Sequence, residues 1–160
     1  MTETPFVPGD FIPPPGLVTP DAVLEPLGSE HNERDYAAWT SSMEHIHATP
    51  GFQDGDDDGP TPDGGRWPRP MTLEENLGDL VRHAADFAAR RGFTYTVLDP
   101  SSHDVVGCLY IYPSRDGVHD ATVESWVRAS RADLDPVLWR TVSTWLAAAW
   151  PFTNPRYAAR

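Results

Sequence analysis

The sequence predicts one α/β (α+β) domain in which a mixed, mostly antiparallel sheet is flanked by helices. Three segments have the period of amphipathic helices, and three successive apolar segments separated by turns have the composition of strands. The expected order of elements is β-α-α-β-β-β-α-β. The chain has 160 residues, of which 39% are hydrophobic, and this is enough to bury one core. We therefore expect a single domain over residues 22–160, preceded by an arm.

The arm, residues 1–21, is rich in proline. Its sequence TETPFVPGDFIPPPGLVTP is typical of extended, partly polyproline backbone. Phe6, Val7, Phe11 and Ile12 are too apolar for a free tail. We expect them to pack on the body of the protein or on a second subunit.

A short strand is expected around Val23–Leu27, and a helix from about Asn32 to His47 follows it. Apolar residues at three- and four-residue spacing support this helix, and Pro50–Gly51 stops it. An acidic loop at about 51–70 comes next and is longer than compact domains usually contain.

The second long helix begins at a capping box, in which Thr72 and Glu75 satisfy each other's backbone N–H groups. Gly92 is expected to end it, after two arginines that complement the helix dipole. Its apolar stripe consists of Leu77, Leu80, Val81, Ala84 and Phe87.

Three strands are then expected at 93–98, 104–112 and 121–129. The last helix should start with Asp135 as its N-cap and Pro136 at its first position. We expect one final strand in FTNPRYAAR, residues 152–160.

Composition excludes several classes of function. The net charge of −12 makes nucleic acid and anionic membranes poor partners, because both attract basic surfaces. No apolar run is long enough to span a bilayer, and the N-terminus does not resemble a signal peptide. The single cysteine, Cys108, excludes an internal disulfide and favours a cytoplasmic protein with a buried, inert thiol.

Metal binding is not expected either. His45 and His47 lie two apart on a helix, so their side chains point in different directions. DGDDDG, residues 54–59, imitates the first half of a calcium loop, but Gly65 stands where such a loop has its glutamate. A solvated acidic loop is therefore the preferred interpretation.

These elements and several local phrases resemble the GNAT-type N-acetyltransferase superfamily. GFTYTVLDPSSHDVVGCLYIYP, residues 92–113, is similar to the family's second and third strands, and ATVESWVRASR, residues 121–131, to its fourth strand and the loop after it. The resemblance covers residues 22–160 and implies a GNAT-like fold that stops about where the family's fifth strand ends. In the family, the fourth strand splays from the fifth. The acyl group and pantetheine enter that gap, and an Arg/Gln-x-x-Gly-x-Gly/Ala loop holds the pyrophosphate.

The resemblance implies acetyl-CoA or another acyl-CoA as cofactor, without a metal. Val127 matches the residue whose backbone pairs with pantetheine, and Arg131 matches the first residue of the phosphate loop. Trp126 and Arg128 flank Val127 and are expected to contribute to the same cofactor site.

The phosphate loop of this chain departs from the family pattern because it contains no glycine. Leu134 and Pro136 stand at the positions of the small residues. Leucine would place a side chain where the phosphates approach, and proline removes one N–H donor. A capping Asp135 carboxylate would use further N–H groups at the helix start.

Glu124 lies on the matched fourth strand and is the candidate general base for an amine substrate. By strand alternation it shares a face with Trp126, and an Arg-paired or solvated carboxylate is the competing interpretation. The resemblance therefore implies an acyl-CoA-dependent N-acyltransferase acting on a small-molecule amine. The alternative is a catalytically degenerate GNAT-like binding or interaction protein. We also expect a homodimer, because an unpaired strand edge near the end of the domain invites pairing.

Overall fold

The computed structural model describes residues 4–53 and 67–160, and its strands form one six-stranded sheet in the order β1-β2-β3-β4-β5-β6. All neighbouring strands are antiparallel except β5 and β6, which are parallel. The predicted mixed, mostly antiparallel sheet is therefore confirmed. The strands are β1 Leu17–Val18, β2 Val23–Pro26, β3 Phe93–Leu98, β4 Val105–Tyr112, β5 Ala121–Val127 and β6 Pro155–Tyr157.

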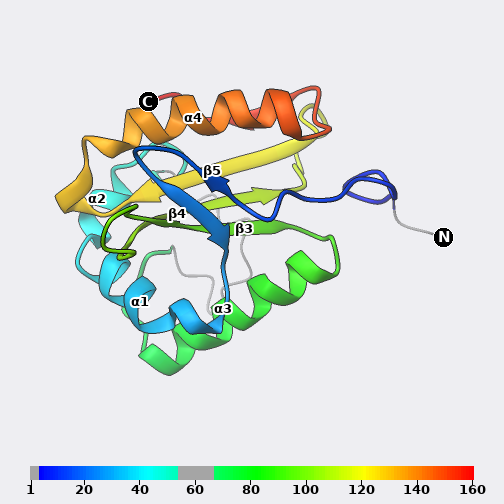
Figure 1. Ribbon diagram of the computed structural model, residues 1–160. Coiled ribbons are helices and arrows are strands. Elements are labelled where there is room, and N and C mark those ends of the chain that lie inside the picture. The colour runs from blue at the N-terminus through cyan, green and yellow to red at the C-terminus, as the bar shows by residue number, and fades with distance from the viewer. Residues whose placement is uncertain (1–3, 54–66) are drawn as a thin grey trace.

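Helices cover both faces of the sheet (Figure 1). Helix α4 lies on one face, and α1 and α3 lie on the other. The acidic loop expected at about 51–70 includes residues 54–66, so the calcium-like sequence within it lies outside the described residues. The helices are α1 Asn32–Thr40, α2 Met43–His47, α3 Leu73–Ala88 and α4 Leu134–Ala149, with short 3-10 turns η1 Ser29–His31 and η2 Ala129–Arg131.

The single helix expected from Asn32 to His47 is wrong, because the chain breaks at Ser41–Ser42 into α1 and α2. The Ser41 hydroxyl donates to the Ala38 carbonyl at 2.9 Å. The Ser42 hydroxyl accepts the backbone N–H of Ala129 at 2.8 Å. Serine hydroxyls that bond to backbone groups in this way compete with the helix.

Helix α3 begins at the predicted capping box, in which Thr72 and Glu75 exchange two hydrogen bonds of 2.9 and 3.0 Å. Its end differs from the prediction. Arg90, with φ 62°, adopts the left-handed conformation that was expected of Gly92. Gly92 is required for another reason, since a Cβ there would lie 2.3 Å from the ring of Tyr112.

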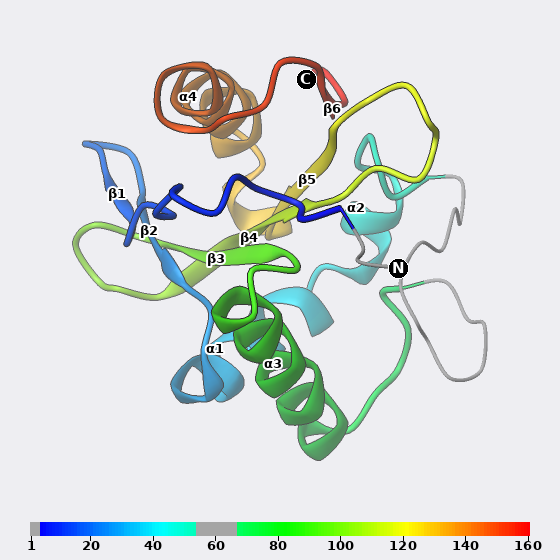
Figure 2. The ribbon, with the colours of Figure 1, turned by 90° about the vertical axis from the view of Figure 1, so that its right-hand side faces the viewer.

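The arm packs on its own chain and passes between α4 and α3 (Figure 2). Phe6 stacks on Phe152 with ring centroids 5.2 Å apart, and Phe11 meets Trp150 at 5.3 Å. The guanidinium of Arg90 donates to two carbonyls of the arm. These contacts hold the arm over the end of the α4-side core, but Ile12, which was expected to pack as well, is 83% exposed.

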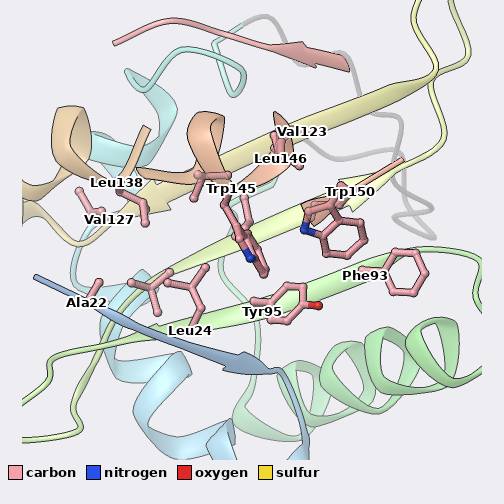
Figure 3. Close-up of a cluster of buried hydrophobic side chains, with 14 of the residues drawn as sticks. Ala22, Leu24, Phe93, Tyr95, Val123, Val127, Leu138, Trp145, Leu146 and Trp150 are labelled. Carbon is pink, nitrogen blue, oxygen red and sulfur yellow. The ribbon is translucent and has the colours of Figure 1, made fainter. Parts of the chain in front are cut away.

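The core has one half on each face of the sheet. Beneath α4, the rings of Tyr95 and Trp145 meet edge to face with their centroids 5.3 Å apart (Figure 3). On the α1 side, Trp39, Cys108 and Trp126 are all fully buried. The expected burial of Cys108 is confirmed, and this burial raises the pKa of the thiol well above its ordinary value.

Candidate functional site

Strands β5 and β6 are joined by a short parallel ladder. Only Ala121, Thr122 and Val123 of β5 have partners on β6, the last pair being Val123 with Tyr157. Beyond this pair, the remainder of β5 continues toward the start of α4 without a partner on β6 among the described residues. Pairing between β5 and β6 therefore stops where the sequence predicted the splay, and we use this name for the unpaired part of β5 together with residues 158–160.

The splay is filled by side chains of the protein itself. The Nη2 of Arg160 donates to the backbone carbonyl of Ser125 at 2.6 Å, and its Nε donates to Oδ2 of Asp135 at 2.8 Å. The Tyr157 and Ser125 hydroxyls are 2.6 Å apart. We call Ser125, Asp135, Tyr157 and Arg160 the splay cluster. It joins β5, β6 and the first turn of α4.

The splay cluster is shielded from water. The Arg160 side chain is 3% exposed and that of Asp135 is 15% exposed. Burial raises the pKa of the Tyr157 hydroxyl to about 12, although its hydrogen bond to Ser125 and the nearby Arg160 act in the opposite direction. Tyr157 therefore keeps its proton at neutral pH, and Arg160 and Asp135 form a largely buried ion pair.

The start of α4 differs from the prediction at three residues. The helix begins at Leu134, so Asp135 is its second residue and not its N-cap, and Pro136 is its third residue and not its first. The Asp135 carboxylate pairs with Arg160 and makes no cap. The Leu134 side chain is 5% exposed and packs into the α4-side core, so it does not extend toward the mouth of the splay.

Several N–H groups of the loop between β5 and α4 already have protein partners. The N–H of Ala129 donates to Ser42, that of Arg131 to the Arg128 carbonyl, and that of Asp135 to the Ala132 carbonyl. Pro136 has no N–H to offer. These N–H groups are therefore not available to a phosphate in the structure as it stands.

The two arginines proposed for the cofactor reach away from the splay. Arg131 donates to Asp99 at 2.9 Å, and Arg128 donates to the Val105 carbonyl at 3.2 Å. Both partners belong to the β3–β4 hairpin, which lies on the opposite side of β5 from β6. The pKa of Asp99 is lowered to about 2, by the backbone N–H groups of Ser102 and Ser101 and then by Arg131.

The other predicted site residues lie on opposite faces of β5. Val127 is buried in the α4-side core, and Trp126 is buried in the α1-side core. The Trp126 Nε1 donates to the Tyr110 hydroxyl at 3.0 Å. Glu124 is half-buried and lies near Gly51, where a Cβ would be 3.8 Å from the glutamate Cγ. As the alternation predicts, it is on the Trp126 face.

Sequence reasoning missed the splay cluster as a unit. Asp135 was noticed only as a helix cap, and Ser125, Tyr157 and Arg160 were not singled out as site residues. Each lies in a different local pattern, and 35 residues separate the hydrogen-bonded pair Ser125 and Arg160. The parallel pairing of β6 with β5 is the feature that brings these four residues together.

Within residues 4–53 and 67–160, no group of three or more histidine, cysteine or acidic side chains is placed to hold a metal ion. In the same part of the chain, no helix combines the length and apolar character needed to cross a bilayer.

Comparison with solved structures identifies the fold as that of the GNAT-type acetyltransferases. A putative GNAT-family acetyltransferase from Bordetella pertussis aligns with a TM-score of 0.55 and 19% identity, covering 84% of this chain and 71% of its own. A protein described as a probable acetyltransferase aligns with a TM-score of 0.64 and 9% identity, covering 90% of this chain and 73% of its own. The microcin C7 self-immunity acetyltransferase, solved with acetyl-CoA and AMP, aligns with a TM-score of 0.57 and 9% identity, covering 84% and 66%. No family model matches the chain, and no curated protein matches it in sequence.

Proposed function

We propose that this protein is an acyl-CoA-dependent N-acyltransferase that acts on an amine in the cytoplasm. The observation that carries the proposal is the splay, where the parallel β5–β6 ladder stops at Val123 and Tyr157. The Ser125 carbonyl lies inside this splay and takes its hydrogen bond from a side chain, not from a strand. The fold and the acetyltransferases that share it support the proposal.

The backbone of the splay fits the pantetheine arm of an acyl-CoA. Ser125 offers a carbonyl to an amide N–H, and Leu134 leaves the mouth clear because its side chain is buried in the core. The fit depends on one side chain, since Arg160 occupies the Ser125 carbonyl. The Asp135 carboxylate is unfavourable beside a pyrophosphate, unless a cation stays paired with it.

The residues around the splay suggest roles in acyl transfer. A bound acyl-CoA supplies an activated thioester to the amine. Glu124 is the candidate base that removes a proton from the amine nitrogen. The Tyr157 hydroxyl keeps its proton to high pH and can therefore donate a hydrogen bond to a departing thiolate. The net charge of −12 favours a cationic amine over an anionic one.

A second candidate function is the binding of another molecule without catalysis. The loop between β5 and α4 favours it, because this loop lacks glycine and has several N–H groups already bonded to the protein. The two candidates differ in whether acetyl-CoA is consumed.

A turnover assay with acetyl-CoA and a panel of cationic amines tests the proposal. Release of free CoA can be followed with a thiol reagent, because the single cysteine is buried and does not contribute to the signal. We expect Glu124→Gln to lower kcat by about 10²–10⁴-fold, the usual contribution of a general base. Glu44→Gln, an exposed glutamate on α2, is the matched control and should leave the rate unchanged. Acetyl-CoA binding without turnover of any amine would favour the second candidate.

A further inference from the structure

We propose that Arg160 is a latch that closes the splay, and that acyl-CoA enters only when this side chain withdraws. The inference rests on the proposed function, because it takes the splay to be the acyl-CoA site. It concerns a residue of this chain, three positions beyond the end of β6.

The position of Arg160 is fixed by contacts on three sides. Its Nη2 donates to the Ser125 carbonyl on β5, and its Nε donates to Asp135 on α4. Its Nη1 donates to the Ala158 carbonyl at 2.6 Å, and its guanidinium lies 5.9 Å from the centroid of the Tyr157 ring. A planar guanidinium with an ionised partner makes some of the strongest hydrogen bonds in proteins. The Arg160 side chain thus connects the segment after β6 to β5, and a ligand in the splay would have to separate these two parts of the chain.

Ser125 and Asp135 lose their hydrogen-bond partner when Arg160 withdraws, and this explains why Arg160 favours its closed position in the splay. When Arg160 withdraws, the Ser125 carbonyl can accept an amide N–H of the pantetheine arm. Asp135, however, loses its cation while it remains largely buried, and this is costly. The phosphates of the cofactor would add negative charge near the same carboxylate, at the first turn of α4. Arg160 and Asp135 together therefore oppose entry of acyl-CoA.

Other features allow the latch to open. Strand β6 is joined to the sheet through only three residue pairs, and Arg160 lies beyond them. The Oδ1 of Asp135 and the Nε1 of Trp139, one helical turn apart on α4, are buried without a hydrogen-bond partner within the described residues. The closed cluster is thus incompletely satisfied, which lowers the cost of rearranging it.

The latch can be tested by measuring the Kd for acetyl-CoA by isothermal titration calorimetry. The set comprises the wild type, Arg160→Ala, Asp135→Asn and the control Arg156→Ala, which removes the same charge from an exposed position on β6. If the latch is closed in nine molecules of ten or more, Arg160→Ala should lower the apparent Kd by about tenfold or more. Asp135→Asn, which frees Arg160 and removes the opposing carboxylate, should also tighten binding. Arg156→Ala should match the wild type.

The other outcomes separate the latch from the proposed function. Equal binding by the wild type and both splay variants would overturn the latch but leave the acyltransferase proposal standing. Weaker binding by Arg160→Ala would identify Arg160 as a cofactor ligand and also overturn the latch. No binding by any protein at millimolar acetyl-CoA would refute both. Circular dichroism and thermal unfolding establish that each variant is folded, and Asp135→Asn decides the matter if Arg160→Ala is not.

Discussion

Asp35 should make the protein less stable as the pH rises. The side chain is 4% exposed, and its Oδ2 accepts a hydrogen bond from the Asn76 amide at 3.1 Å. Burial raises the pKa of Asp35 from 3.8 to about 6, the Asn76 hydrogen bond opposes this, and the charge of Asp79 adds to it. The folded chain therefore binds the proton more tightly than the unfolded chain does.

The magnitude follows from the difference between the folded and unfolded pKa. A difference of about 2 corresponds to roughly 3 kcal/mol, which is lost as the pH rises from about 4 to about 6 and remains lost above that range. Asp35→Asn keeps an acceptor for Asn76 and has no charge to bury. We therefore compare the free energy of unfolding of the variant with that of the wild type. This difference should shift in favour of the variant by roughly 3 kcal/mol between acid and neutral pH. In a domain of this size the gain is about 6–12 °C in Tm.

Urea unfolding of both proteins at pH 5 and pH 7.5 measures this effect. The two proteins share every other titrating group, so the change in their difference in unfolding free energy reports Asp35 alone. Roughly half of the full effect, about 1.5 kcal/mol, should appear between these two pH values. If the stability of the variant relative to the wild type is the same at both pH values, or falls as the pH rises, Asp35 is not held in an unfavourable charged state.

Three further predictions concern the fold and the assembly. Gly107→Ala should lower the free energy of unfolding by about 2–3 kcal/mol in a thermal unfolding assay, because the added Cβ would lie 2.3 Å from the backbone carbonyl of Trp126. In the same assay Gly78→Ala should stabilise the protein by roughly 1 kcal/mol, because its Cβ would meet nothing within 4 Å and alanine favours helix α3. Arg90→Ala removes two hydrogen bonds to the arm, so it should lower the free energy of unfolding by about 2 kcal/mol and speed amide exchange in residues 4–16. The homodimer expected from the β6 edge predicts twice the 17.7 kDa chain mass in light scattering at micromolar concentration, and a mass of one chain would refute it.

Features set by neighbouring residues could be predicted from the sequence. The capping box at Thr72 and Glu75 involves residues three apart, and the strands of the β3–β4–β5 meander are defined by their own composition and turns. The break at Ser41–Ser42 could not be predicted in this way. It depends on the N–H of Ala129, which is 87 residues from Ser42 along the chain.

The candidate site shows the same limit. The position of the splay followed from the resemblance, and the face of Glu124 followed from strand alternation. Whether Asp135 would cap its helix or pair with a cation could not be decided locally, because Arg160 is 25 residues away. Intrinsic preference predicts the left-handed residue after α3 at Gly92, whereas the chain adopts that conformation at Arg90, where the Arg91 N–H bonds back to the Asp86 carbonyl.

The connection into β6 has a consequence for the order in which the sheet assembles. Strands β3, β4 and β5 follow one another through short turns, so their ladders form from contacts that are close in sequence. Strand β6 can join only after α4 has crossed the sheet, and it then contributes three residue pairs. We expect the amide hydrogens of β6 to exchange with solvent sooner than those of β4, which is paired on both sides. A ligand that needs β6 to move would therefore draw on an opening motion that costs far less than unfolding the domain.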